Sequence, residues 1–443
     1  APGSARASGP GAVATDALRR RAGDGDPGPP LRLQWRPYRF ALPREMVTSQ
    51  GAWSERQGWL LRLEAADGRL GWGEAAHPPA AEPRSPAATP PPAAARPPGR
   101  FRPQAGSAAG TGASGVDGPE VPHQPAQPPG DGDNGPAAPR LPTLGPTGIT
   151  RLTTIDPSLL PSTLERRQLE DRLPALPLSL ACALGMALAE LDGLGSSRRG
   201  GWLMAPPSAV LLPAGDDAIA ALDEALAERR VAEGQDHPSG RPVRSPEGGP
   251  GTGRGLTVKW KVAACADALE RRVLEALLQR LPADGHLRLD ANGGWDRRTA
   301  ERWAERLAEE PRLDWLEQPL HPDDHEGLWA LAAQLPVALD ESLRDAPAGI
   351  AGDWPAVDWP GWLVRRPLLE GDPRPLLTAL EAGTPRLMLS TALETGIGRR
   401  FLQHLAGLQA CGPTPTAPGL APGWRPLGAL FSPEPERAWR AAG

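Results

Sequence analysis

The sequence predicts an α/β protein in which a small N-terminal α+β domain precedes a modified TIM-type (β/α) barrel. In the second half of the chain, six short runs begin with apolar residues and end in a charged or polar residue, and their end residues lie 23 to 29 residues apart. That interval is the length of one strand, one helix and two loops. Near the N-terminus, apolar strand-like runs flank a turn. The six runs are LTVKWKV at 256–262, HLRLDAN at 286–292, DWLEQP at 314–319, VALDES at 337–342, GWLVRRP at 361–367 and RLMLST at 386–391.

The composition excludes several classes of protein. The chain has 443 residues, a net charge of −5 and a pI near 5.9, so it lacks the basic footprint of a nucleic-acid or anionic-membrane partner. No apolar run reaches the roughly 18 residues that a membrane span needs. Residues 1–30 also lack the apolar core of a secretory signal. We therefore expect a soluble, cytoplasmic protein that is a monomer or a small homo-oligomer.

The three cysteines are Cys182, Cys265 and Cys411. They are odd in number, widely spaced and set in apolar or helical surroundings. We expect buried free thiols in a reducing compartment.

The N-terminal capping α+β domain is expected to comprise residues 31–76 and 149–200. Its sequence predicts strands over 32–42 and 58–76, with a hairpin turn at Ala66-Asp67-Gly68 in the second stretch. Helical spacing then predicts helices over Ser162–Asp171 and Ser179–Leu194.

Several segments predict no folded structure. Residues 1–30 and 77–148 are rich in Pro, Ala and Gly and carry no apolar periodicity, so they cannot bury enough surface to offset the entropy of ordering. We interpret them as a disordered tail and a low-complexity disordered insertion. A second break falls at Glu233–Gly255.

Residues 431–443, after the barrel, are expected to form a C-terminal tail.

The barrel is expected over residues 201–430. Its first strand is predicted within Trp202–Pro213, and Asp217–Arg229 follows as its helix. The closing strand cannot be placed, because the sequence after Cys411 is rich in Pro and Gly. The other barrel helices are predicted at Ala264–Leu281, Asp296–Glu309, Asp323–Leu335, Pro373–Glu381 and Thr395–Gln409.

Three acidic residues, Asp290, Glu317 and Asp340, end successive predicted strands. Parallel strands open at one edge, so three carboxylates would face one mouth, an unfavourable arrangement without a positive charge between them. A hard divalent cation, Mg2+, suits such oxygen ligands. The alternative is that these acids only cap the following helices, as we expect of Asp296 and Asp323. Three acids in register favour the metal site.

Lys259 and Lys261 alternate around Trp260, so both ammonium groups should point to the same side of a strand. If Trp260 packs outward, both lysines point into the barrel. Mutual repulsion and partial desolvation would then lower the pKa of at least one lysine toward neutrality, which suits a general base. The alternative is a pair of surface lysines on an edge strand.

Arg365 and Arg366 end the sixth barrel strand, and alternation alone does not show which of them faces inward. Ser390 and Thr391 end the seventh strand ahead of a helix. Their hydroxyls and the nearby backbone donors could hold a substrate carboxylate, or they could only cap that helix.

His321 and His325 have the spacing of a zinc pair. Pro322, Asp323 and Asp324 interrupt them at a loop-to-helix junction, and no further ligand lies at a suitable spacing. We do not expect a metal role. The chain also lacks a nucleophile elbow, a P-loop and a dinucleotide-binding glycine pattern.

Taken together, these runs resemble the enolase superfamily and, within it, the o-succinylbenzoate synthase family. The resemblance covers residues 31–76 and about 150–430. Each run alone is weakly specific, whereas their order and spacing are strongly specific for the superfamily. The runs that carry it are GWGEAA at 71–76, VKWKV at 258–262, LRLDANGGW at 287–295, WLEQP at 315–319, ALDES at 338–342 and LSTALETGIG at 389–398.

The resemblance implies a capping domain over a modified barrel that binds Mg2+ and a small carboxylate substrate, with no nucleic-acid or membrane partner. It implies that Lys261 is the catalytic base and that Lys259 is its neighbour. The implied metal ligands are Asp290, Glu317 and Asp340, and the implied substrate-binding residues are Arg288, Asn292, Ser390 and Thr391.

One residue departs from the family pattern. Where these enzymes usually have Lys-Pro at the end of the sixth strand, this chain has Arg366-Pro367. Arginine keeps the positive charge but cannot transfer a proton near neutral pH. A dehydration that uses one base tolerates this change, whereas a racemase or epimerase needs a base on each face. Another lyase or cycloisomerase of the superfamily, or an enolase-like barrel that only binds a ligand, are the other hypotheses.

Overall fold

The computed structural model describes residues 30–48, 51–76, 157, 160–234, 255–343 and 358–443. The chain divides into two compact units, one of residues 1–82 with 152–443 and one of residues 83–151. All the described residues belong to the first unit. All but the last residue of the expected tail at 1–30, the expected insertion at 77–148 and most of the break at 233–255 lie outside the described residues.

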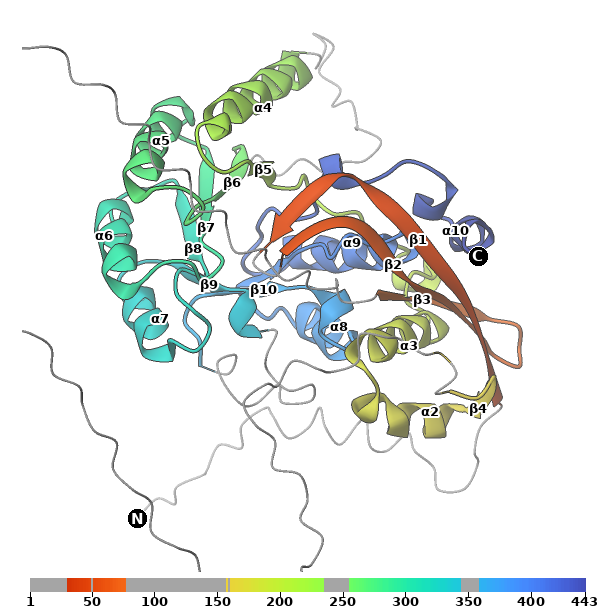
Figure 1. Cartoon of the computed structure of the whole chain (residues 1–443). Coiled ribbons are helices and arrows are strands. Elements are labelled where there is room, and N and C mark those ends of the chain that lie inside the picture. Colours follow the sequence, from red (N-terminus) through yellow and green to blue (C-terminus); the bar gives the residue numbers. More distant parts are fainter. Residues whose placement is uncertain (1–29, 49–50, 77–156, 158–159, 235–254, 344–357) are drawn as a thin grey trace, which may run out of the picture. The chain divides into compact units, whose positions relative to one another are not determined.

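The N-terminal domain is an antiparallel sheet with the strand order β3-β2-β1-β4 (Figure 1). The sheet confirms the predicted strands and the hairpin turn, where Gly68 has a φ of +83° and its N–H donates to the carbonyl of Ala65. The left-handed backbone at this position explains the glycine. The strands are β1 (Pro30–Thr48), β2 (Gly51–Glu64), β3 (Leu70–Ala76) and β4 (Thr163–Glu165).

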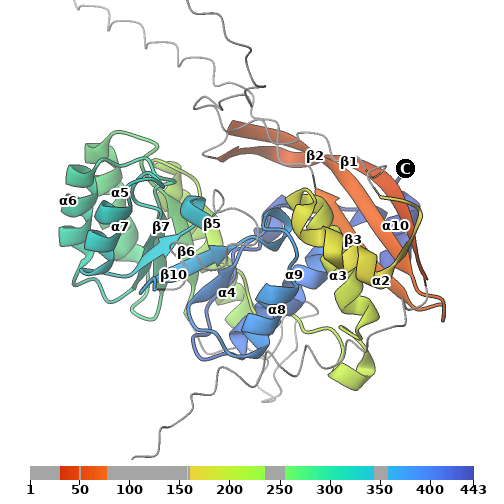
Figure 2. The ribbon, with the colours of Figure 1, turned by 90° about the horizontal axis from the view of Figure 1, so that it is seen from below.

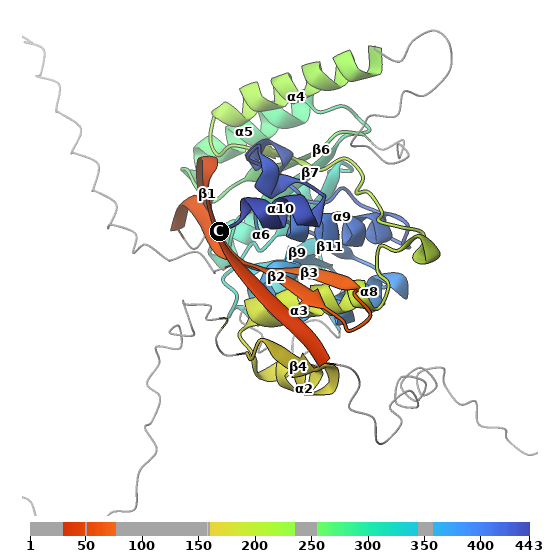
Figure 3. The ribbon, with the colours of Figure 1, turned by 90° about the vertical axis from the view of Figure 1, so that its right-hand side faces the viewer.

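Helix α3 (Leu178–Leu191) packs on this sheet, in contact with β3 (Figure 3). Gly71 and Gly73 allow this close approach, since a Cβ on either would lie about 2 Å from a helix carbonyl oxygen, that of Ala187 or Ala183. The leucines and alanines of the helix fill the core between the two layers. The helix confirms the prediction over Ser179–Leu194.

One prediction for this part was wrong. The helix expected over Ser162–Asp171 begins only at α2 (Arg166–Arg172), because Thr163–Glu165 pair with β1 and extend the sheet. The segment expected as a C-terminal tail, 431–443, contains the helix α10 (Pro435–Ala441). The Trp439 ring lies 5.7 Å from that of Trp72, so burial of this indole holds the segment against the sheet.

The second domain is a parallel seven-stranded sheet in the order β11-β10-β9-β8-β7-β6-β5. Its strands follow the chain in sequence, as in a (β/α) barrel. They fall within the six regularly spaced runs and the predicted first strand. The strands are β5 (Val210–Leu212), β6 (Thr257–Lys261), β7 (His286–Asp290), β8 (Leu313–Glu317), β9 (Val337–Leu339), β10 (Trp362–Arg365) and β11 (Leu387–Leu389).

A short segment around Gly419 links the two edges of this sheet. The Gly419 N–H donates to Leu389 at 2.8 Å, and the Thr391 N–H donates to Gly419 at 2.9 Å. On the other edge, the Ala209 N–H donates to the carbonyl of Pro418 at 2.9 Å. The closing element, which the sequence did not place, therefore lies at 418–420.

The barrel helices agree with the predicted ones to within a few residues. Helices α5, α6 and α7 lie side by side on the outer face of the sheet (Figures 1 and 2). Asp296 caps α6 by accepting the Thr299 N–H at 2.7 Å, as expected, but Asp324, and not Asp323, caps α7. The helices are α4 (Asp217–Gly234), α5 (Asp267–Arg280), α6 (Arg297–Leu307), α7 (His325–Ala332), α8 (Arg374–Glu381) and α9 (Gly396–Ala410).

The cysteine prediction holds in part. All three thiols are free, but only Cys182 is buried, whereas Cys265 and Cys411 are exposed. Burial raises the pKa of the Cys182 thiol well above its usual value. Among the described helices, none has both the length and the apolar character that crossing a membrane requires.

Candidate active site

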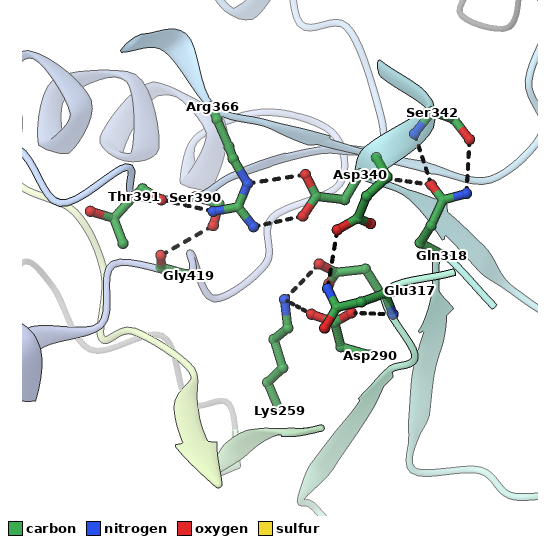
Figure 4. Close-up of polar contacts among 12 residues, drawn as sticks. Lys259, Asp290, Glu317, Gln318, Asp340, Ser342, Arg366, Ser390, Thr391 and Gly419 are labelled. Carbon is green, nitrogen blue, oxygen red and sulfur yellow. Dashed lines mark hydrogen bonds and ion pairs between the residues drawn. The ribbon is translucent and has the colours of Figure 1, made fainter. Parts of the chain in front are cut away.

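Three carboxylates meet at the C-terminal edge of the barrel sheet, as the strand-end pattern predicted. Asp290 and Glu317 are the last residues of β7 and β8, and Asp340 directly follows β9. All three are at most 1% exposed. Register pairs Asp290 with Glu317 on adjacent strands, so the negative charges are close together (Figure 4).

Both lysines of β6 point into this cluster. Lys259 Nζ lies 2.6 Å from Glu317 Oε1 and 2.7 Å from Asp290 Oδ2. Lys261 Nζ lies 2.6 Å from the same Asp290 oxygen. Trp260 between them is fully buried on the other face, with its ring 6.4 Å from that of Trp303. The lysines are therefore interior residues, and the surface alternative is excluded.

Arg365 and Arg366, at the end of β10, have different partners. Arg366 turns inward, and its Nε and Nη2 donate to the two carboxylate oxygens of Asp340 at 3.0 and 2.6 Å. Its Nη1 donates to the carbonyl of Thr391 at 2.7 Å. Arg365 instead pairs with Glu370, 2.6 Å away. Arg366 is thus the strand-end cation that lies with the carboxylates.

The electrostatics corrects one prediction. Burial lowers the pKa of Lys259, but the charges of Asp290 and Glu317 outweigh it and raise the pKa above its usual value. Repulsion and desolvation were expected to lower the pKa of at least one of the two lysines, and for Lys259 the charges of the adjacent carboxylates reverse that direction. Burial raises the pKa of Asp290, but the two lysines lower it by more, so that pKa lies below its usual value. Burial and the Asp290 charge raise the pKa of Glu317 to about 7.

The donor set fits a hard divalent cation. It consists of buried carboxylate oxygens, the ligands that Mg2+ takes in proteins. An ammonium group, Lys259 Nζ, already bridges Asp290 and Glu317, which shows that the site accepts positive charge between them. The side chains here make ion pairs with one another. No group of three or more His, Cys, Asp or Glu side chains has metal-holding geometry within the described ranges.

Asn292, an expected substrate-binding residue, lies beside the lysines and carboxylates. Its Oδ1 accepts from Lys261 Nζ at 2.9 Å, and its backbone N–H donates to Asp290 Oδ1 at 3.1 Å. Its φ of +47° is left-handed, a conformation that asparagine adopts more readily than most residues. The geometry thus gives Asn292 contact with both Lys261 and Asp290.

Arg288 lies in the barrel interior but is occupied by protein partners. Its side chain is 0% exposed and donates to Asp314, to the Thr416 hydroxyl and to the Ala417 carbonyl at 2.7 to 2.9 Å. The guanidinium also lies 4.0 Å from the centre of the Trp315 ring. Through these contacts Arg288 holds the closing segment, and the expected contact with substrate stays a prediction.

Ser390 and Thr391 lie near Arg366 at the end of β11 (Figure 4). The Thr391 hydroxyl donates to Glu394 at 2.6 Å and accepts the Leu393 N–H at 2.9 Å. The Ser390 hydroxyl has a long contact of 3.4 Å with the Gly419 carbonyl. Neither hydroxyl caps α9, so the capping alternative does not hold for them.

Glu74 is a site-supporting residue whose role the sequence did not reveal. It is fully buried on β3 and accepts the backbone N–H groups of Thr395 and Gly398, at 3.0 and 3.1 Å, at the start of α9. The Tyr38 hydroxyl donates to it at 2.7 Å. This carboxylate ties the N-terminal sheet to the segment that follows Thr391. A buried acid inside an apolar strand was the available signal.

Gln318 is a second such residue. It follows Glu317 with a φ of +38° and is fully buried. Its Oε1 accepts the backbone N–H groups of Asp340 and Ser342 at 3.2 and 3.0 Å (Figure 4). Gln318 thereby holds the end of β9, and with it Asp340.

The two histidines have no part in the site. His321 is largely exposed and lies 3.5 Å from Asp323, and His325 begins α7.

Comparison with known proteins places this site in a family. Residues 254–348 match the model of the enolase C-terminal domain-like family. The o-succinylbenzoate synthase of Thermosynechococcus vestitus is 41% identical over 155 residues, which are 34% of this chain and 48% of that relative. The crystal structure of the enzyme from Thermosynechococcus elongatus BP-1, complexed with Mg in its active site, has a TM-score of 0.56 at 25% identity and covers 93% of this chain and 99% of that one. These similarities support a relationship of the chain to the enolase superfamily.

A second solved structure shares the fold. The L-Ala-D/L-Glu epimerase of Bacillus subtilis has a TM-score of 0.52 at 17% identity over 90% of this chain and 91% of that one. The sequence matches are shorter, and the chain spans about half the length of the curated relatives it matches. The enolase fold, with its sheet-rich cap and curled parallel sheet, thus confirms the predicted fold class.

Proposed function

We propose that this chain is a magnesium-dependent o-succinylbenzoate synthase, a carbon–oxygen lyase. It would dehydrate 2-succinyl-6-hydroxy-2,4-cyclohexadiene-1-carboxylate to o-succinylbenzoate, on a route to menaquinone or phylloquinone. The observation that carries the proposal is the pair of inward lysines beside three buried carboxylates, with Arg366 and not a second base at the end of β10. The similarity to o-succinylbenzoate synthases supports it.

The proton chemistry would belong to Lys261. Its amine lies within 2.9 Å of Asn292 Oδ1 and 2.6 Å of Asp290, so two acceptors orient it. It is also more exposed than Lys259, with 26% of its side chain accessible against 11%. A substrate entering from the mouth would reach Lys261 first. Its amine would remove the proton α to the carboxylate, and the resulting ammonium would protonate the β-hydroxyl as it leaves.

The charge chemistry would belong to the carboxylates and the other cations. A Mg2+ ion held by Asp290, Glu317 and Asp340 would offset the negative charge that develops on the substrate carboxylate. Lys259 is held between two of these carboxylates and would add a fixed positive charge nearby. Such neutralisation is needed because a proton next to a carboxylate is very weakly acidic.

Arg366 argues against a racemase or epimerase. Burial lowers the pKa of the Arg366 guanidinium, but the adjacent Asp340 carboxylate raises it by more. The guanidinium therefore stays charged at any physiological pH. A reaction that needs a second base on the opposite face lacks one at this position. A dehydration in which one lysine serves both steps does not need it.

The test is turnover of the cyclohexadiene carboxylate by the purified chain with Mg2+, followed by the absorbance of the aromatic product. We expect product formation that chelation abolishes and added Mg2+ restores. Mg2+ binding without turnover would support an enolase-like binding protein. Turnover of a different carboxylate substrate would support a sister lyase or cycloisomerase.

A further inference from the structure

The backbone just after the lysine strand adopts an unusual conformation. Ala263, two residues after Lys261, has a φ of +59°. This left-handed region is unfavourable for alanine, because its Cβ crowds the following carbonyl. Such a conformation persists only where the surroundings hold it, and it is common at functional sites.

Glu270 of α5 holds this turn. Its carboxylate is 1% exposed and accepts three successive backbone N–H groups. Oε2 accepts from Ala263 at 3.0 Å, and Oε1 accepts from Ala264 at 2.9 Å and from Cys265 at 2.8 Å. All three donors precede the helix, so Glu270 organises the loop and does not only cap its own helix.

The same turn packs against the loop that carries Asn292. A Cβ built on Gly294 would lie 2.9 Å from the Cβ of Ala263, so the two loops are in close contact. Between them, the Val262 N–H donates to the Asp290 carbonyl at 3.0 Å. The position of the turn therefore affects both Lys261 and its partner Asn292.

We propose that Glu270 is a positioning residue for Lys261. By binding three N–H groups it keeps Ala263 left-handed, ends β6 at Lys261 and seats the turn against the Asn292 loop. The amine of Lys261 is then held between Asp290 and Asn292, the geometry shown by its contacts of 2.6 and 2.9 Å. Its link to catalysis rests on the proposed function, whereas its effect on the lysine does not.

The experiment compares Glu270→Gln and Glu270→Ala with Asp296→Ala in the full chain. Glutamine retains one acceptor oxygen for Ala264 and Cys265 but turns an NH2 group toward the N–H of Ala263, so it removes one contact selectively. Asp296→Ala removes the cap of α6, with its bond to the Thr299 N–H, and is the control for an ordinary loss of helix capping.

The first measurement is the rate at which formaldehyde and cyanoborohydride methylate Lys261, resolved by mass spectrometry. We expect Glu270→Gln to raise that rate by about fivefold and the amide exchange of residues 263–265 by about tenfold, because the turn opens more often. Asp296→Ala should change neither by more than about twofold. Should Glu270→Ala not fold, Glu270→Gln carries the test alone.

The second measurement is turnover. We expect Glu270→Gln to lower kcat by about 10- to 100-fold with KM changed by less than about threefold, since a misplaced base affects the chemical step more than binding. Lys261 methylation equal to wild type would overturn the positioning role. A chain that shows the methylation change but never turns over the substrate would overturn the proposed function and leave the positioning role standing.

Discussion

Arg366 donates two parallel hydrogen bonds to Asp340, from Nε to Oδ1 at 3.0 Å and from Nη2 to Oδ2 at 2.6 Å. This pair is bidentate and largely buried, the strongest form of an arginine–carboxylate contact. A cation that binds Asp340 must therefore compete with Arg366 for the same oxygens. A lysine at this position could not make such a fork.

We accordingly expect Arg366→Met to bind Mg2+ about tenfold more tightly, because it leaves a buried carboxylate without its competing cation. Titration calorimetry with Mg2+ or Mn2+ measures this affinity. The neighbouring change Arg365→Met is the control, since Arg365 pairs with Glu370 outside the cluster. An affinity equal to or weaker than that of wild type would show that Asp340 is not a metal ligand.

Lys261→Ala should lower turnover by at least about 10³-fold, which is within the contribution of a positioned general base. Mg2+ binding should be retained, because the substitution removes an ammonium group from Asp290 and leaves the carboxylates in place. Steady-state kinetics and metal titration measure the two effects separately. If turnover survives, the base is elsewhere, and Lys259 is the next candidate.

Glu74→Ala should destabilise the fold by about 2–4 kcal/mol, because it leaves buried N–H groups of Thr395 and Gly398 without their acceptor. The free energy of unfolding in urea measures this cost. Glu55→Ala is the control in the same sheet. Glu55 forms an exposed ion pair with Arg39, worth less than about 1 kcal/mol. Equal losses for the two variants would contradict the structural role of Glu74.

Glu190 predicts a pH dependence of stability. Burial raises its pKa to about 7, although Arg400 pairs with it and opposes the shift. In the unfolded chain the carboxyl group titrates near 4.5, so between about pH 4.5 and pH 7 the folded state holds more protons. Stability from this group is complete below pH 4.5 and is lost as the pH rises through 7.

The variant Glu190→Gln should remove that part of the pH dependence. We expect the wild-type free energy of unfolding to fall by about 1–3 kcal/mol more than that of the variant between pH 5 and pH 8. Urea unfolding at these two pH values gives the comparison. Parallel curves for the two proteins would mean that Glu190 titrates normally in the folded state.

The sequence pattern predicted that the two lysines share one face of their strand and that the acids lie at strand ends. A strand has a period of two, so Lys259 and Lys261 had to share a face once Trp260 was placed outward. The regular interval between runs placed Asp290 and Glu317 on neighbouring strand ends, which the register confirms. These are local rules, and they need no knowledge of distant contacts.

Distant contacts explain what the sequence did not reveal. The sequence could not show that Thr163–Glu165 would pair with β1, or that Arg288 would bind Thr416 and Ala417, 128 and 129 residues away. It also placed the two lysines on one face of a strand without showing that two carboxylates lie within 2.7 Å of Lys259. The direction of that pKa shift followed from the three-dimensional distances and not from the order of the residues.

The sequence by itself therefore determined the α/β barrel, its strand order and which residue types line its mouth, because hydrophobic periodicity and strand alternation are properties of short segments. Only the tertiary structure decided which of Arg365 and Arg366 turns inward, where the barrel closes and how Glu270 holds Ala263. Each of these depends on a contact between a side chain or backbone group and a partner from another segment. The packing of the whole sheet and its helices determines such contacts.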